Sequence, residues 1–204
     1  MFLTLPVYYD TIGASDQFDR SGGLSNMSVS QKSNKFAVST EFDIASGSLG
    51  KILLAMQGQS VVKVSLGDCE DELLRDCQAR FPGVVQNKNH SFIPDAIKQL
   101  KLLLDQPATA WTLPLDLQGT EFQKEVWLAI SQIPVGTTAT YQELAIAIGR
   151  KSSVRAVASA CGANPVAIVV PCHRVLRSDG GMGGYRWGVQ RKEELLLRES
   201  ELHF

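Results

Sequence analysis

The chain has 204 residues, of which 44% are hydrophobic and 20% charged, an ordinary mixture for one globular domain or two small ones. No apolar stretch approaches the roughly 18 residues of a membrane-spanning helix, which excludes an integral membrane protein. The first residues carry neither the basic segment nor the long apolar run of a secretory signal. Four irregularly spaced cysteines are too few for a disulfide framework, so we predict a reducing compartment, the cytoplasm. The net charge of −1, taken alone, does not indicate a polyanionic partner.

The first part of the chain predicts a tail followed by a small sheet. Residues 1–35 are interpreted as a flexible tail or linker, because residues 13–33 are rich in glycine and serine and carry little apolar surface. Apolar residues then alternate with polar ones from Phe36 to Phe42, and short apolar runs follow at 49–56 and 61–66. This pattern predicts an antiparallel meander of three strands.

Two helices are expected after these strands. Asp68 is placed to cap a helix over residues 69–81, which ends at Pro82-Gly83. Pro94 opens a second helix that continues to residue 104 and stops before Pro107. The strands and these two helices form a predicted α+β unit over residues 36–114.

Beyond residue 115 the pattern becomes mainly helical. Thr120 and Gln123 have the spacing of a capping box, and Thr140 caps a helix over 141–148 that exits at Gly149. Ser152 or Ser153 starts a further helix that runs to about residue 163, and the last helix spans 190–201. Residues 115–204 are therefore predicted as a second, helical domain, and the fold class of the chain is α+β.

The two helices on either side of Gly149 have the order of a helix-turn-helix, a weak signal when taken alone. The second of them is rich in small residues, which fits either tight internal packing or close approach to a nucleic-acid groove. Residues 141–192 carry eight basic and two acidic side chains, whereas residues 1–140 carry 11 basic and 15 acidic ones. Such polarity can give one face a positive potential in a chain that is neutral overall, although a solvated basic face explains it equally well.

The chemistry points to Cys172. An apolar run ends at Pro171, and Cys172, His173 and Arg174 follow together, with a glycine-rich loop over residues 180–184 after them. A histidine base and nearby positive charge favour the nucleophilic thiolate. Adjacent side chains in an extended chain point apart, so His173 needs a turn or a bridging water to reach the thiol. The chain has no Cys-x-x-Cys pair, so neither a zinc site nor another metal site is expected.

The segment Pro171-Cys-His-Arg-Val175 resembles the O6-alkylguanine-DNA alkyltransferases, also called methylated-DNA–protein-cysteine methyltransferases. Further family motifs follow in the family's order and spacing: Thr140–Ala145, Val154–Val157, Asn164-Pro165, Tyr185-Arg-Trp-Gly188 and Arg191–Glu193. The similarity is close from about residue 112 to 199 and loose from residue 36. The Tyr-Arg-Trp-Gly form is most similar to the bacterial adaptive-response members.

The resemblance implies a DNA repair reaction in which Cys172 irreversibly takes the alkyl group from a guanine flipped out of double-stranded DNA, with no cofactor. His173 would deprotonate Cys172 through a water, and Glu193 would orient the imidazole. Tyr141 would crowd the target phosphate and donate a hydrogen bond to the flipped base. Arg155 would fill the gap in the duplex, with its helix in the minor groove. The other implied site residues are Asn164 at the turn before the active-site strand, the loop residues Ser178, Tyr185 and Arg186, and the base-pocket residues Val175, Trp187 and Cys161.

Two departures from the family pattern bear on substrates and metals. Arg186 and Trp187 stand where other members have small residues, so we predict a pocket that takes methyl better than bulky alkyl groups. The ligands of the structural zinc found in some members have no counterpart here. A non-catalytic sensor of alkylated DNA is the alternative, which the presence of Cys172 opposes, and a cysteine hydrolase would leave Tyr141 and Arg155 unexplained. A monomer is expected.

Overall fold

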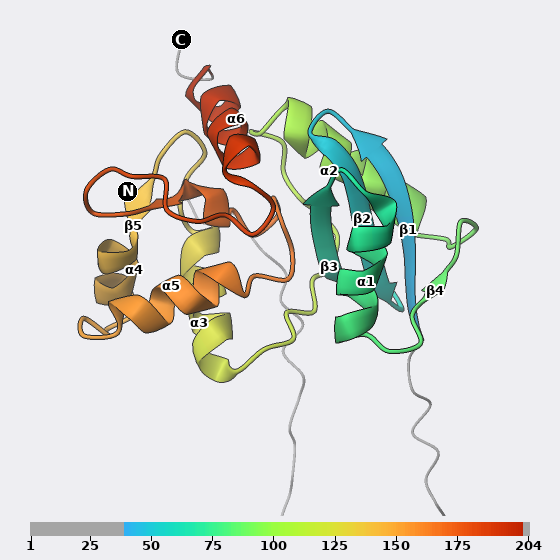
Figure 1. Cartoon of the computed structure of the whole chain (residues 1–204), viewed down its shortest axis with the longest axis horizontal. Coiled ribbons are helices and arrows are strands. Elements are labelled where there is room, and N and C mark those ends of the chain that lie inside the picture. Colours follow the sequence, from blue (N-terminus) through green and yellow to red (C-terminus); the bar gives the residue numbers. More distant parts are fainter. Residues whose placement is uncertain (1–38, 202–204) are drawn as a thin grey trace, which may run out of the picture.

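The computed structural model describes residues 39–201. Figure 1 shows two halves, one built around a sheet and the other mainly helical. The predicted tail over residues 1–35 and the start of the alternating pattern at Phe36 lie outside the described residues. Within residues 39–201, no helix combines the length and the apolar character that a membrane span requires. The predicted α+β class is confirmed.

The sheet contains the predicted meander and one strand that was not predicted. β1 (Thr40–Gly47), β2 (Gly50–Gln57) and β3 (Ser60–Gly67) are antiparallel neighbours, and β4 (Val85–Gln86) pairs with β1 in parallel. The sheet order is β3-β2-β1-β4. The expectation of a purely antiparallel sheet was therefore wrong, because a strand of two residues is too short to show any periodicity in the sequence.

Two helices cover opposite faces of this sheet, α1 (Glu70–Arg80) on one and α2 (Ile93–Asp105) on the other (Figure 1). Alternate residues of β2 divide between two apolar clusters, as the period of two in a strand requires. Leu53 and Ala55 pack with α1, whereas Ile52, Leu54 and Met56 pack in the larger cluster with α2. The sheet is therefore buried on both faces.

The prediction that Asp68 caps α1 was wrong. The residue that precedes α1 is Cys69, without a side-chain cap, and the carboxylate of Asp68 accepts a hydrogen bond from Arg191 at 2.5 Å instead. A cation 123 residues away in the sequence thus takes the carboxylate that local spacing assigned to the helix start.

The helical half begins with two capping boxes at the predicted positions. Thr120 caps α3 (Glu121–Ser131) with Gln123, and Thr140 caps α4 (Tyr141–Ala147) with Glu143. Gly149 follows α4 with φ of +70°, a left-handed conformation that favours glycine. The remaining elements are α5 (Val154–Gly162), a 3-10 turn (Cys172–Arg174), the short parallel pair of β5 (Ala139–Thr140) and β6 (Val175–Leu176), and α6 (Val189–Ser200).

The edge of β3 connects the two halves. The amide of Val64 donates to the carbonyl of Pro165 at 2.9 Å, and the amide of Ala167 donates to the carbonyl of Val64 at 3.0 Å. One cluster of buried apolar side chains extends from β2 and β3 to α3, α5 and the segment before Cys172. The sheet therefore supports the segment that carries the candidate nucleophile, and the proposed domain boundary near residue 115 stays a prediction.

Candidate active site

Cys172 begins the 3-10 turn and is 7% exposed, on the wall of a pocket. Asn164, fully buried at the end of α5, holds the chain around it. Its Nδ2 atom donates to Sγ of Cys172 at 3.1 Å and to the carbonyl of Val170 at 2.9 Å. Its Oδ1 atom accepts from the amide of Val166 at 2.9 Å. One amide side chain thus fixes the turn from α5 to the active-site segment and contacts the sulfur itself.

The thiol of Cys172 is protonated at neutral pH in the free protein. Burial raises the pKa of Cys172 to about 11, and the hydrogen bond from Asn164 and the charge of Lys192 only partly oppose this. The thiolate is the nucleophile, so a base must remove the proton when the substrate is bound. The neighbouring residue in the sequence supplies a candidate.

His173 is buried and bound to a carboxylate. Its Nε2 atom lies 2.8 Å from Oε1 of Glu199, and Arg174 donates to both oxygens of the same carboxylate. Burial would raise the pKa of Glu199, but the hydrogen bonds from His173 and Arg174 outweigh it and lower the pKa to about 2. Burial lowers the pKa of His173, against the opposing effect of Glu199, so the imidazole is neutral at pH 7.

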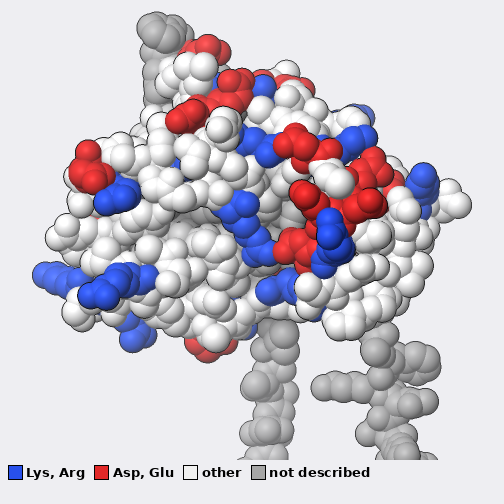
Figure 2. Space-filling view, in the orientation of Figure 1, with Lys and Arg blue, Asp and Glu red and all other residues white. Residues whose placement is uncertain are grey.

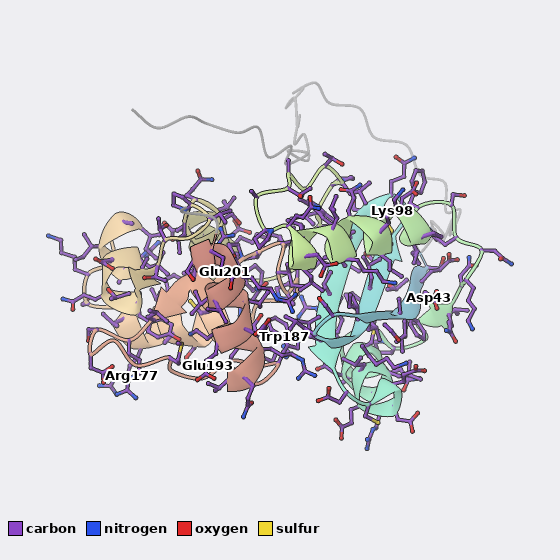
Figure 3. The ribbon with its side chains drawn as sticks, turned by 90° about the horizontal axis from the view of Figure 1, so that it is seen from above. Asp43, Lys98, Arg177, Trp187, Glu193 and Glu201 are labelled. Atoms are coloured by element: carbon purple, nitrogen blue, oxygen red, sulfur yellow. The ribbon has the colours of Figure 1, made fainter. Side chains whose placement is uncertain are left out.

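The partner of His173 is therefore Glu199, and its assignment to Glu193 from the family motif was wrong. Glu193 is exposed on α6 (Figure 3), whereas the buried residues of that helix are Lys192, Leu195 and Glu199. These three have the i, i+3, i+7 spacing of one helix face. Glu193 is one residue from Lys192, about 100° around the helix, and faces away from the histidine. The sequence did contain a signal for Glu199: the helical spacing from Leu195 places Glu199 on the buried face of α6.

The pocket beside Cys172 has a volume of about 640 Å³. Its lining combines α4, α5 and the glycine-rich loop. The lining residues are Tyr141, Ala158, Cys161, Gly162, Cys172, Arg177, Gly183, Gly184, Tyr185 and Arg186. The structure thus brings five of the expected site residues to one cavity, from segments up to 45 residues apart: Tyr141, Cys161, Cys172, Tyr185 and Arg186.

Among the residues expected in the loop and the base pocket, three do not line this pocket, and neither do His173, Glu193, Arg155 and Asn164. Trp187 is buried behind the wall, with its ring centroid 5.1 Å from that of Tyr185, where the helical half meets the sheet (Figure 3). Ser178 is exposed at the tip of the loop. The carbonyl of Val175, which the resemblance assigns to the base, accepts a hydrogen bond from Lys192 at 2.6 Å.

Lys192, one of the eight basic side chains of residues 141–192 and a member of the motif Arg191–Glu193, is fully buried beneath the pocket loop. Its Nζ atom donates to the carbonyl of Val175, in β6 before the loop, and to the carbonyl of Met182 within the loop. At the other side of the loop, Gly183 has φ of +64°, and a Cβ atom there would lie 3.3 Å from the hydroxyl oxygen of Tyr141. The loop is thus held from below and approaches Tyr141 closely through a glycine.

The helix pair next to the pocket presents a basic, small-residue surface. Figure 2 shows blue side chains gathered at the free end of the α4–α5 pair, where Arg150, Lys151 and Arg155 lie in the chain. Ala156, Ser159 and Gly162 are exposed on the same helix as Arg155, so this face of α5 is free of large side chains. Red side chains gather instead in the region of α1, whose first turn is acidic.

Comparison with known proteins assigns this site to a family. Residues 121–201 match the family described as 6-O-methylguanine DNA methyltransferase, DNA binding domain. The bifunctional transcriptional activator and DNA repair enzyme Ada of Escherichia coli is 41% identical over 94% of this chain and 51% of its own length. The chain thus spans about half the length of that relative.

Two further relatives are matched over most of their length. The methylated-DNA–protein-cysteine methyltransferase of Methanosarcina barkeri is 44% identical over 56% of this chain and 73% of its own length. The Mycobacterium tuberculosis protein OGT, solved in complex with DNA, is 33% identical over 79% of this chain and 93% of its own, with a TM-score of 0.69. The chain belongs to the methylated-DNA–protein-cysteine methyltransferase family.

Proposed function

We propose that this protein repairs DNA by transferring the alkyl group of O6-alkylguanine, chiefly O6-methylguanine, to its own Cys172. The observation that carries the proposal is the position of the thiol. Cys172 lies in the wall of a pocket that is also lined by Tyr141 and by small residues of α5, the helix that carries Arg155. A base must leave the duplex to reach such a pocket, since the O6 substituent is inaccessible within the stack.

The transfer forms one bond and breaks another. The sulfur of Cys172 attacks the alkyl carbon attached to O6, a carbon–sulfur bond forms, and the carbon–oxygen bond breaks with its electron pair returning to oxygen. Guanine regains its normal form when N1 takes up a proton. This proton balances the one lost by the thiol, so the reaction consumes no other reactant. The product thioether leaves each protein molecule with no nucleophile for a second cycle.

The proton path follows from the hydrogen bonds of His173. Glu199 is ionised and can only accept, so Nε2 of His173 carries the proton and Nδ1 is the basic nitrogen in this network. Nδ1 is buried and has no hydrogen-bond partner among residues 39–201. A proton accepted there makes an imidazolium that the Glu199 carboxylate stabilises. The family's water-mediated transfer from Cys172 to His173 fits this tautomer.

The DNA contacts belong to the helix pair. Arg155 and the exposed small residues of α5 support an approach to a groove of double-stranded DNA, with Arg155 in the gap left by the flipped guanine. Tyr141 starts α4 and lines the pocket, and this position supports a role in contacting both the target phosphate and the extruded base. We also propose a monomer, with residues 36–114 supporting the helical domain, and a cytoplasmic location.

The test is intact-protein mass spectrometry after incubation with a duplex that holds one O6-methylguanine. We expect the mass of a single methyl group to be gained by the wild-type protein and by Cys161→Ser, which alters another cysteine of the same pocket. Cys172→Ser should gain nothing. A folded wild-type protein that binds the duplex without gaining mass would instead support the damage sensor.

A further inference from the structure

The wall of the pocket is tied to the helix α1 of the other half of the molecule. Arg186 lines the pocket, and its Nη2 atom donates to Oδ1 of Asp76 at 2.5 Å, although 110 residues separate the two. Asp76 is the only residue within 39–201 to which the guanidinium of Arg186 donates a hydrogen bond. The position of this pocket side chain thus depends on a carboxylate from outside the helical half.

The carboxylate of Asp76 is itself held in place by a buried cation. Its Oδ2 atom lies 2.7 Å from Nζ of Lys63, a side chain of β3 that is 1% exposed between the sheet and α1. Burial would raise the pKa of Asp76, but Lys63 and Arg186 outweigh it and lower the pKa, so the group is ionised at neutral pH. A fixed lysine therefore fixes the aspartate, and the aspartate fixes Arg186.

The charges around Asp76 make the position of Arg186 depend on its carboxylate. Asp76 is the anion next to Lys63 and Arg186, and Arg80 is close enough to sense both Asp76 and Arg186. Without the carboxylate, Lys63 and Arg80 would repel Arg186 from α1. The backbone of the wall would stay in place, because Arg191 donates to the carbonyl of Trp187 and Lys192 holds the loop. The change would fall on the Arg186 side chain.

We propose that Asp76 is a positioning residue that sets which alkyl groups the pocket accepts, by holding Arg186 at the pocket wall. The inference rests on the proposed alkyl transfer and gives the sheet half a role in substrate choice. With Arg186 held, the wall is closed on that side and a methyl group fits better than a benzyl group. With Arg186 released, its side chain no longer closes the wall on that side, and the discrimination between the two alkyl groups decreases.

The experiment measures the rate of alkyl transfer to Cys172 from duplexes that hold O6-methylguanine or O6-benzylguanine. Asp76→Asn would leave Lys63 buried without a partner, so it is made in a Lys63→Met background in which this burial cost is absent. We expect Asp76→Asn in that background to lower the methyl-to-benzyl rate ratio by roughly threefold, the size of one partly exposed ion pair. Asp76→Glu should restore the ratio.

Two controls separate this role from a general effect on folding. Asp71→Asn makes the same change on an exposed residue of the same helix and should leave the ratio unchanged. In an Arg186→Ala background, Asp76→Asn should have no further effect on the ratio, because its target is gone. The proposal is overturned if Asp76→Asn leaves the ratio unaltered with Arg186 present, or alters it equally without Arg186. A wild-type protein that transfers no methyl group would overturn the proposed function instead.

Discussion

Oε1 of Glu199 lies 2.8 Å from Nε2 of His173, and both side chains are almost completely buried. Arg174 donates to the same carboxylate and also to the carbonyl of Ile133 at 2.6 Å. The three side chains therefore form one buried network in which a single negative charge is shared. Loss of that charge would leave a buried cation and an imidazole without their acceptor.

Glu199→Gln is expected to reduce both activity and stability. The variant keeps the shape of the side chain but removes the charge that orients and stabilises His173, so transfer should slow by about 100-fold, the lower end of the range for general acid–base catalysis. The free energy of unfolding should fall by about 3–5 kcal/mol, because Arg174 stays buried without its partner. Single-turnover transfer and denaturant unfolding measure the two effects.

Glu193→Gln is the matched control on the same helix. Glu193 is exposed and belongs to the motif from which its role was first inferred. We expect its substitution to change neither transfer nor stability measurably. If Glu193→Gln slowed transfer and Glu199→Gln did not, the assignment made from the structure would be wrong.

The contrast between these two glutamates shows what could be predicted from the sequence. The nucleophile was found because Cys172 and His173 are adjacent in a motif whose chemistry is local. The carboxylate was missed because a motif places residues along the chain, whereas the contact depends on which face of α6 is buried. Lys192 was missed for the same reason, since its burial also depends on which face of α6 packs against the protein, and its hydrogen bonds go to two backbone carbonyls outside that helix.

The pH dependence of transfer is predicted from the pKa shifts of His173 and Cys172. Burial lowers the pKa of His173 below its ordinary value of about 6.5, so the neutral imidazole predominates at neutrality. Transfer should therefore be level around pH 7 and fall only at a pH below the ordinary pKa of about 6.5, where His173 takes up a proton. The folded state should lose stability in the same direction, because the unfolded chain binds the proton more tightly.

Rates measured in a series of buffers, with unfolding followed at each pH, provide the check. In His173→Gln the proton acceptor is gone, and the thiol has a pKa raised to about 11. Its residual rate should then rise with pH through neutrality. A wild-type rate that also rose across neutrality would indicate that His173 does not take the thiol proton.

Asn164→Ala is expected to slow transfer and destabilise the protein. The variant leaves the buried amide of Val166 without its acceptor, at a cost of about 1–3 kcal/mol, whereas the carbonyl of Val170 keeps the hydrogen bond from the amide of Cys172. It also removes the donor to Sγ of Cys172, which favours the thiolate. Denaturant unfolding and the rate of methyl transfer are measured together.

Asn87→Ala serves as the comparison for Asn164. Asn87 donates to Glu41 at 2.8 Å in the sheet half and lines no part of the pocket that holds Cys172. Its loss should leave the transfer rate unchanged. An Asn164→Ala protein that loses stability but transfers at the wild-type rate would reduce Asn164 to a structural residue.

Local signals in the sequence predicted the helix starts better than the contacts between the halves. Thr120 and Thr140 cap their helices as expected, because a capping box closes within three residues. The hydrogen bonds of Val64 to Pro165 and Ala167 connect segments about a hundred residues apart, and no periodicity in the sequence predicts such contacts. The failure at Asp68 has the same origin, since a distant arginine competes for the carboxylate.

A substitution in the basic turn between α4 and α5 should change the affinity for DNA without a specific effect on base flipping. Lys151 is exposed at this turn, and we expect Lys151→Ala to weaken binding of undamaged and O6-methylguanine duplexes equally. The slope of log affinity against log salt should decrease by about 1, as for the loss of one phosphate contact. Lys98→Ala, on α2 at a distance from this turn (Figure 3), should alter neither affinity nor slope.

Arg155→Ala should act differently, because Arg155 extends from the exposed face of α5 that is free of large side chains. We expect it to slow methyl transfer at saturating duplex by more than it weakens binding, since the gap left by the flipped guanine is then unfilled. Arg155→Lys keeps the charge but not the planar group, and it should restore binding more fully than transfer. Binding by anisotropy and transfer by single-turnover quenching separate the two quantities. Equal losses in both, for Arg155→Ala as for Lys151→Ala, would make Arg155 a phosphate contact only.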